Sequence, residues 1–244
     1  EGHLYSPFLK APGEPADAVP GSFVGLVVSG GHSALYRVSD GEIKTIAETR
    51  DDAMGEVFDK VGKRLGLAYP QGPLVDELAE AGRPGRFSLP IARLRDGGLD
   101  FSFSGLKTQT IRCVEEIERE GVDTDLGKLG EQYLEAPAQV TGLLADFRQA
   151  AVGQILERLS RLYDEEPFDL LAVSGGAAAN RLLRREAATW AEGRGVDLRL
   201  VALRYSGDNA AMIAHAALLR HQRGEVDDPL TAEAASRIPM GGRS

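Results

Sequence analysis

Two almost wholly apolar segments, Ser22–Ser29 and Phe168–Ser174, place the strongest constraint on how this chain can fold. Each has the length of a β-strand, and an unbroken apolar run of that length is typical of a strand buried on both faces of a sheet. Each is followed at once by a pair of glycines, Gly30-Gly31 in the first case and Gly175-Gly176 in the second. The chain is therefore predicted to be an α/β protein with helices covering its sheet.

The remaining periodicity predicts a mixed sheet. The alternating segment Ser33–Val38 and the short segment Ile43–Glu48 complete a run of three strands near the start. Apolar residues at helical spacing then predict a helix over Ala53–Leu67, and Tyr69–Pro73 is predicted to be a rigid turn. Further helices are predicted at Leu74–Ala81, Lys107–Glu120, Ala138–Tyr163, Asn180–Ala191 and Asn209–His221, and further strands at Phe101–Phe103 and Asp197–Ala202.

Two irregular segments set the predicted domain limits. Residues 11–21 contain three prolines and two glycines, which is typical of a linker. Because so short a segment rarely precedes a linker, we expect residues 1–21 to be the end of a preceding lobe whose other residues are missing upstream. Residues 22–222 form the predicted α/β lobe. Residues 223–244 are polar and are predicted to be a partly disordered tail.

Charge and composition exclude several classes of protein. The formal net charge of the 244 residues is −9, which argues against a chain built mainly to grip nucleic acid. No apolar run approaches the ~20 residues that a membrane-spanning helix needs, so no membrane contact is expected. The single cysteine, Cys113, cannot form an internal disulfide, and we expect it to be a small buried side chain in a cytoplasmic protein.

Two glycine turns are the first candidates for a binding site. The segment Val27–His32 places small residues directly after a buried strand, where exposed backbone N–H groups can cradle a phosphate or a carbonyl; a tight hairpin turn is the alternative. The segment Ala172–Asn180 leads instead into a helix, whose N-terminus favours anions. Its run of small residues leaves room for a flat group such as adenine. Asn180 either caps that helix or binds a ribose or base.

Three further residues have weaker individual signals. Asp59 lies on a different helix face from Lys60, although an ordinary surface position is the simpler interpretation. Asp208 precedes a predicted helix, where Asp208 or Asn209 would be a good N-cap; a carboxylate there could equally bind a metal. His3 is a potential metal ligand, but one histidine alone does not define a metal site.

Six segments, taken together and in order, resemble the tRNA threonylcarbamoyladenosine transferase family, called TsaD in bacteria and formerly described as a glycoprotease or O-sialoglycoprotein endopeptidase. The resemblance is specific because all six occur with family-like spacing, from residue 1 to about residue 220. The segments are EGH at 1–3, VVSGGH at 27–32, GEVFDKVGKRLGLAYPQGP at 55–73, DFSFSGLKT at 100–108, SGGAAAN at 174–180 and YSGDNAAM at 205–212.

The resemblance implies a fold and a set of site residues. The family has the actin, Hsp70 and sugar-kinase fold, an RNase H-like class with two lobes and a ligand cleft between them. The chain would then be the second lobe, with a five-stranded mixed sheet and flanking helices, plus a short end of the first. His3 and Asp208 match two metal ligands of the family. The matches to its substrate and nucleotide contacts are Val27, Val28, Ser29, Gly30, Gly31, Asp59, Gly72 and Asn180.

The implied reaction is transfer of a threonylcarbamoyl group from threonylcarbamoyl-adenylate to N6 of the tRNA adenosine beside the anticodon, with release of AMP. The resemblance implies one divalent metal per subunit, iron in preference to zinc or magnesium. It implies three kinds of partner: tRNA, an inactive paralogue (TsaB-like) and a small ATPase (TsaE-like). No general base can be named.

Two alternatives to a transferase are a binding module and a metalloprotease. A fragment of the family could act only as a nucleotide-binding or scaffolding module, although the inactive paralogues usually lack the metal ligands that His3 and Asp208 match. A metalloprotease is the second alternative, but the sequence has no H-E-x-x-H motif.

Overall fold

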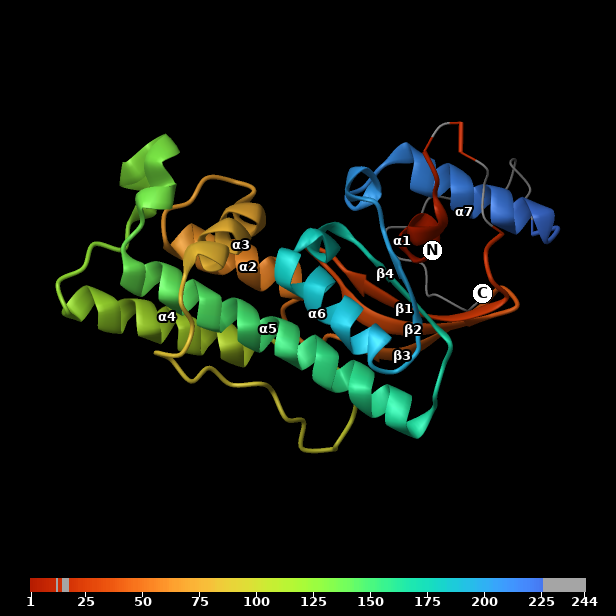
Figure 1. Cartoon of the computed structure of the whole chain (residues 1–244), viewed down its shortest axis with the longest axis horizontal. Coiled ribbons are helices and arrows are strands. Elements are labelled where there is room, and N and C mark those ends of the chain that lie inside the picture. The colour runs from red at the N-terminus through yellow and green to blue at the C-terminus, as the bar shows by residue number, and fades with distance from the viewer. Residues whose placement is uncertain (12, 15–17, 226–244) are drawn as a thin grey trace.

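The computed structural model describes residues 1–11, 13–14 and 18–225 of the chain (Figure 1). Its centre is a five-stranded sheet with the strand order β3-β2-β1-β4-β5. The strands are β1 (Ser22–Val28), β2 (Ser33–Ser39), β3 (Glu42–Glu48), β4 (Leu170–Ser174) and β5 (Asp197–Leu200). The first three pair antiparallel, whereas β4 pairs parallel with β1 and β5 pairs parallel with β4. The predicted mixed sheet is confirmed.

Local chemistry accounts for the hairpin at the sheet edge. Asp40 and Gly41 connect β2 to β3 with φ angles of 49° and 87°. Two successive residues at positive φ make the kind of turn whose twist matches the twist of the flanking strands. Aspartate tolerates this conformation better than most residues with a side chain, and glycine adopts it without steric cost.

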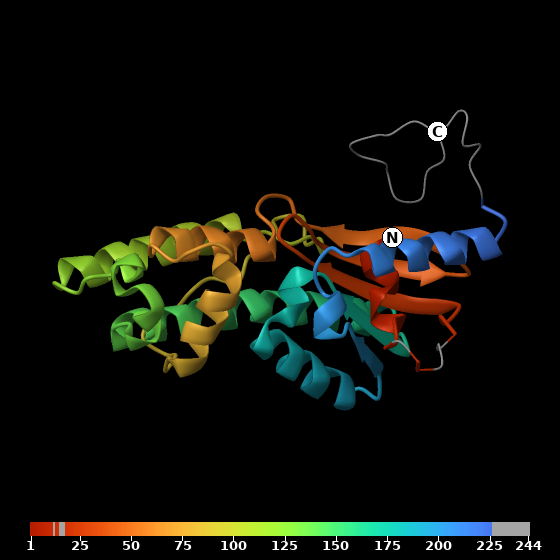
Figure 2. The same cartoon turned by 90° about the horizontal axis from the view of Figure 1, so that it is seen from above.

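Helices occupy much of the rest of the described chain. A block formed by α2, α3, α4 and the first part of α5 extends away from the sheet, on the left in Figure 1, and α5 then continues alongside the sheet. Figure 2 shows the same division from above. The α-helices are α1 (Gly2–Tyr5), α2 (Met54–Arg64), α3 (Gln71–Ala81), α4 (Ser104–Arg119), α5 (Ala138–Glu165), α6 (Arg181–Glu192) and α7 (Ala210–Gln222). The 3-10 segments are η1 (Ser6–Phe8), η2 (Leu126–Glu135), η3 (Gly176–Ala179) and η4 (Leu203–Tyr205).

Two of the predicted elements differ from the structure. The expected strand at Phe101–Phe103 is wrong, since only a single parallel bridge joins Phe101 to Thr49. Both phenylalanines are fully buried and their rings stack with centroids 6.1 Å apart, so their alternation with serines comes from packing of an irregular segment. The turn at Tyr69–Pro73 is shorter than predicted, because α3 already begins at Gln71.

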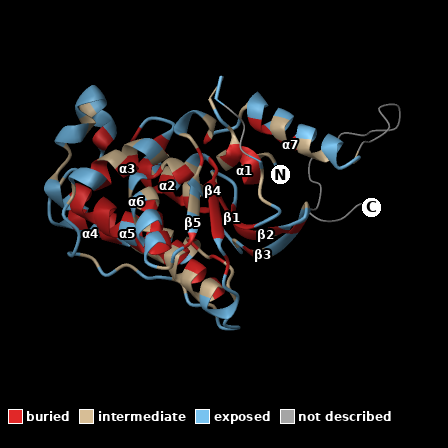
Figure 3. Cartoon of the chain, turned by 45° about the vertical axis from the view of Figure 1, so that its right-hand side comes forward, coloured by how far each residue is buried: buried red, intermediate tan, exposed pale blue. Residues whose placement is uncertain are grey.

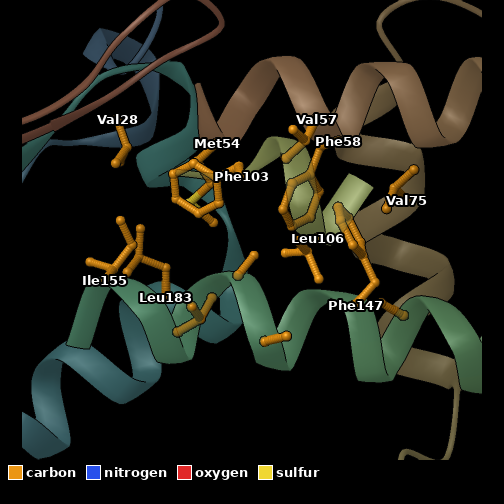
Figure 4. Close-up of a cluster of buried hydrophobic side chains, with 14 of the residues drawn as sticks. Val28, Met54, Val57, Phe58, Val75, Phe103, Leu106, Phe147, Ile155 and Leu183 are labelled. Atoms are coloured by element: carbon orange, nitrogen blue, oxygen red, sulfur yellow. The ribbon is translucent and has the colours of Figure 1, made fainter. Parts of the chain in front are cut away.

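The larger core lies between one face of the sheet and the helical block. Figure 4 shows Phe58 of α2 facing Phe147 of α5, with their ring centroids 4.7 Å apart. Val28 at the end of β1 lies in the same cluster and is fully buried. Cys113 is also buried here, and burial raises the pKa of its thiol, which fits the expectation of a small core side chain.

A smaller core covers the opposite face of the sheet. Leu4 and Tyr5 of α1 pack there against Phe23 of β1, next to α7 (Figure 1). Gly25 of β1 makes this packing possible, since a Cβ at that position would lie 2.4 Å from a methyl carbon of Leu4. Figure 3 shows that α7 is mostly exposed on its outer side. The sheet is thus covered on both faces, as its apolar strands predicted.

Two predicted features fall partly or wholly outside the described residues. They are the linker at residues 11–21, of which positions 12 and 15–17 are not described, and the tail, of which residues 226–244 are not described. In the part that is described, no helix combines the length and the apolar character needed to cross a bilayer.

Candidate functional site

The strand order brings the two glycine turns to one edge of the sheet. Strands β1 and β4 are parallel neighbours with Val27 opposite Ser174, so both turns leave at the carboxyl ends of the strands. Gly175 has a φ of 96°, and a Cβ at this position would lie 2.2 Å from the carbonyl oxygen of Val28. Only glycine allows the two backbones to come this close. Ligands of open α/β sheets commonly bind at such an edge.

An open pocket of about 1070 Å³ lies beside the first glycine turn. It is bounded by the β1–β2 turn, by α1, and by the loop and first turn of α7, three segments that are distant in the sequence. Its lining residues are Glu1, Gly2, His3, Leu4, Val27, Ser29, Gly30, Gly31, His32, Tyr36, Gly176, Gly207, Asp208, Asn209, Ala210, Met212 and Ile213.

The β1–β2 turn is closed by its own hydrogen bonds. The Ser29 N–H donates to the carbonyl oxygen of His32 at 2.8 Å, and the His32 N–H donates to Ser29 Oγ at 3.1 Å. A Cβ added at Gly30 or at Gly31 would meet nothing within 4 Å. The backbone of both glycines is therefore open to the pocket, whereas Val28 is buried beneath it. From the other side, the Gly55 N–H of α2 donates to the Ser29 carbonyl oxygen at 3.2 Å.

His3 and Asp208 meet in the same pocket although they are far apart in the sequence. His3 Nε2 lies 3.1 Å from Asp208 Oδ1, with 19% of the histidine side chain and 91% of the aspartate side chain exposed. Burial lowers the pKa of His3, and the nearby Asp208 carboxylate opposes that shift in part. Asp208 does not cap α7, because Asn209 Oδ1 accepts the hydrogen bond from the Met212 N–H.

The donor chemistry of this pair fits a divalent metal. A lowered pKa favours the neutral imidazole, which is the form that binds metals. The buried Nδ1 of His3 has no hydrogen-bond partner within the described residues. An imidazole nitrogen beside a carboxylate suits a transition metal. Among those same residues, however, no three His, Cys, Asp or Glu side chains are close enough to hold one metal together, so the pair supplies only two ligands.

Asp59 and Gly72 contact each other and do not line this pocket. Asp59 Oδ1 of α2 accepts a hydrogen bond of 2.8 Å from the Gly72 N–H in the first turn of α3. A carboxylate at this position satisfies a backbone donor and is favoured by the helix dipole. In this conformation Asp59 therefore joins α2 to α3.

Asn180 also has a role in joining helices. Its Oδ1 caps α6 by accepting from the Leu183 N–H, and its Nδ2 donates to Asp76 Oδ1 of α3 at 2.7 Å. The second oxygen of Asp76 accepts from the Arg181 N–H, and the buried Arg148 donates to Asp76 from α5. Asn180 is 8% exposed and is not among the residues that line the pocket. It caps α6, the helix that follows the second glycine turn.

The sequence interpretation missed two polar residues of this region. Asp76 is buried in α3 with Val75, Leu78 and Ala79, but Glu77 follows it directly and Glu80 lies one turn on, so the sequence around it resembles an ordinary charged helix face. His32 ends the first glycine motif and lines the pocket. Its position directly after Gly30-Gly31 could have marked it, but it was not assigned a role.

Comparisons with known proteins agree on one family. The family model described as "TsaD: tRNA N6-adenosine threonylcarbamoyltransferase" matches residues 1–215. Curated proteins with the same name are 38% identical in Bdellovibrio bacteriovorus, over 93% of this chain and 62% of that protein, and 44% identical in Burkholderia mallei, over 91% and 61%. The chain thus spans slightly less than two thirds of the length of these relatives.

A solved structure supports the fold. The crystal structure of T. kodakarensis HypF aligns with 92% of this chain and 36% of its own, with a TM-score of 0.62 and 13% sequence identity. At that identity the likeness concerns the fold alone. It agrees with the expected actin, Hsp70 and sugar-kinase class, in which helices flank a mixed five-stranded sheet.

Proposed function

The chain belongs to the tRNA N6-adenosine threonylcarbamoyltransferase family, and on that premise we propose that it transfers a threonylcarbamoyl group from threonylcarbamoyl-adenylate to N6 of the tRNA adenosine beside the anticodon. The observation that carries this proposal is the pocket that joins an accessible glycine turn to the His3–Asp208 pair. The first feature suits a nucleotide phosphate and the second suits a metal, and a reaction of an acyl-adenylate needs charge stabilisation at both places.

The glycine turn is the proposed holder of the adenylate. The open backbone at Gly30 and Gly31 lets a phosphoryl or carbonyl oxygen approach the main chain closely. The turn from Gly175 to Asn180 lies at the same edge of the sheet, and its Gly176 also lines the pocket. Asp59, Gly72 and Asn180 support this site through the helices α2, α3 and α6 that they join.

We propose that His3 and Asp208 hold one divalent metal. An imidazole ligand favours a transition metal over magnesium, and the resemblance to the family favours iron over zinc. When bound, such a metal acts as a Lewis acid that stabilises negative charge on the reacting group. His3 Nε2 and Asp208 Oδ1 lie 3.1 Å apart, a separation at which both atoms can reach the same metal ion.

The partners follow from the same proposal. The acceptor is tRNA, and we place the protein in the cytoplasm with it. Because the formal net charge is −9, much of the grip on tRNA is expected to come from basic surface outside this chain. A TsaB-like inactive paralogue and a TsaE-like ATPase are the proposed protein partners.

The test is a transfer assay with a matched control. Purified protein is loaded with iron, supplied with threonylcarbamoyl-adenylate, tRNA and the partner proteins, and the modified adenosine is measured by mass spectrometry. Asp208→Ala is expected to lower both metal content and transfer at least 100-fold, whereas Asp123→Ala, which removes an exposed carboxylate paired with Lys128, is expected to change neither. No transfer by the loaded wild-type protein would sink the proposal. Nucleotide binding without transfer would indicate a nucleotide-binding module instead.

A further inference from the structure

His32 is a pocket residue that the proposed function does not yet use. It follows the two glycines of the β1–β2 turn, its side chain is exposed, and it lines the same pocket as His3 and Asp208. Its backbone is fixed at both ends, because its N–H and its carbonyl oxygen both bond to Ser29. The backbone of His32 is therefore held in place beside the open backbone of the two glycines.

His32 shares the pocket with the His3–Asp208 pair. Yet no group of three metal-binding side chains occurs among the described residues, so His32 does not complete a metal site with His3 and Asp208. His32 therefore belongs to the glycine turn and does not join the His3–Asp208 pair.

Other polar side chains of the pocket already have partners. The amide nitrogen of Asn209 donates to the carbonyl oxygens of Tyr205 and Gly207, and His3 Nε2 faces Asp208. The imidazole of His32 makes no hydrogen bond or ion pair within the described part of the chain, which leaves its ring N–H available to a ligand.

We propose that the His32 imidazole contacts the phosphoryl group of the bound adenylate and donates a hydrogen bond to one of its oxygens. This inference rests on the proposed function, because it assumes that the adenylate lies against the glycine turn. Two carboxylates, Glu1 and Asp208, line the same pocket and repel a bound phosphoryl group. A ring N–H that donates a hydrogen bond to a phosphoryl oxygen beside the turn would offset part of that repulsion. Arg220 lies 3.8 Å from Glu1 and offsets part of that charge.

The experiment compares AMP with adenosine, which differ only in the phosphoryl group. Binding of each is measured by calorimetry for the wild-type protein, His32→Ala, His32→Gln and His221→Ala. His221 is the matched control, because it is an exposed histidine on α7 that does not line the pocket. Since a hydrogen bond to a charged group is lost, His32→Ala is expected to weaken AMP binding about tenfold and to leave adenosine binding within about twofold. His32→Gln, which retains an N–H donor, is expected to recover part of the loss, and His221→Ala to match the wild type.

Each other outcome is decisive. Unchanged AMP affinity in His32→Ala would overturn the proposed contact, and so would an equal loss for AMP and adenosine, because a purely structural role affects both ligands. If the wild-type protein binds AMP and only the His32 comparison fails, the proposed function stands and this inference falls. If the wild-type protein binds neither compound, the nucleotide site of the proposed function falls together with the contact.

Discussion

Single glycines decide whether the candidate site can form. Gly55 lies in the first turn of α2 directly under the β1–β2 turn, and a Cβ there would lie 2.5 Å from the Ser29 carbonyl oxygen and 3.0 Å from Gly30 Cα. Both of these are backbone atoms, so neither moves without displacing the turn itself. Gly175 fixes the other turn in the same way against Val28. The accessible backbone of the pocket therefore depends on contacts made below it.

A pair of glycine substitutions tests this dependence. Gly55→Ala is expected to lower the free energy of unfolding by about 1–3 kcal/mol through overpacking and to weaken AMP binding, because the turn must shift. Gly105 is the control, since it occupies the equivalent place in the first turn of α4 and a Cβ there meets nothing within 4 Å. Gly105→Ala is expected to stabilise by about 0.4–1 kcal/mol. Urea denaturation measures both, and equal effects of the two changes would contradict this account.

The sequence could predict some of these residues and not others. The first glycine turn, His3 and Asp208 were assigned from motifs, and the structure places all of them along one pocket. The partners of Asp59 and Asn180 were out of reach, because a hydrogen bond such as Asn180 to Asp76 joins residues from distant helices. A side chain that completes a helix cap looks the same in a sequence as one that binds a ligand.

At the scale of elements, one face of α5 supports residues 82–103, a long connection between α3 and α4 that contains no helix or named strand. Gln154 bonds to both the N–H and the carbonyl of Ser102, and Arg158 donates to the carbonyl oxygens of Asp100 and Ala92. Asp146 accepts from the N–H groups of Gly85 and Phe87. These residues recur at helical spacing, so a single helix satisfies backbone groups that would otherwise lack partners.

Arg158 provides a test of that support. It is 1% exposed, and Arg158→Met keeps most of its volume while removing its hydrogen bonds to the segment. We expect trypsin to cut after the exposed Arg93 or Arg95 about tenfold faster in this variant, because local opening costs less. Arg119→Met, at the exposed end of α4, is the control and is expected to leave these cuts unchanged. Cleavage at the wild-type rate in Arg158→Met would show that other contacts hold the segment.

Elements were easier to predict than their connections. The six longer helices and the five strands of the sheet follow from apolar spacing, which the sequence carries locally. The strand expected at Phe101–Phe103 was wrong because its alternation arises from burial against α5 and not from pairing with a strand. Local periodicity reports which side chains are buried, but not what covers them.

At the scale of the whole molecule, the negative net charge of the chain opposes binding of the proposed tRNA substrate. The pocket is lined by Glu1 and Asp208, and the chain has a formal net charge of −9. Phosphate contacts from lysine and arginine supply most non-specific affinity for nucleic acid. In an acidic chain the excess of carboxylates repels the phosphates and offsets those contacts. The α/β class with a mixed sheet, in contrast, was predictable from element order, whereas the actin, Hsp70 and sugar-kinase class was implied only by the family resemblance.

The charge gives a prediction about tRNA binding. We expect this chain alone to bind tRNA with a dissociation constant weaker than about 10 µM at near-physiological salt, in the range of non-specific binding. Fluorescence anisotropy at low and moderate salt measures it, with a DNA hairpin of equal length as the control. A submicromolar constant for tRNA that the hairpin does not share would show that this chain carries the grip itself.

The pairing of β1 with β4 has a consequence for how the protein reaches its folded state. The two strands are neighbours at the centre of the sheet, yet all of residues 29–169 lie between them. The hairpins of β1, β2 and β3 form between residues that are close in the sequence. Strands β1 and β4 pair only after the ends of the long intervening segment have been brought together, which costs much chain entropy. The carboxyl edge of the sheet, where both glycine turns meet, should therefore be among the last regions to gain protection from hydrogen exchange during refolding. A nascent chain would carry its first glycine turn long before it has the second.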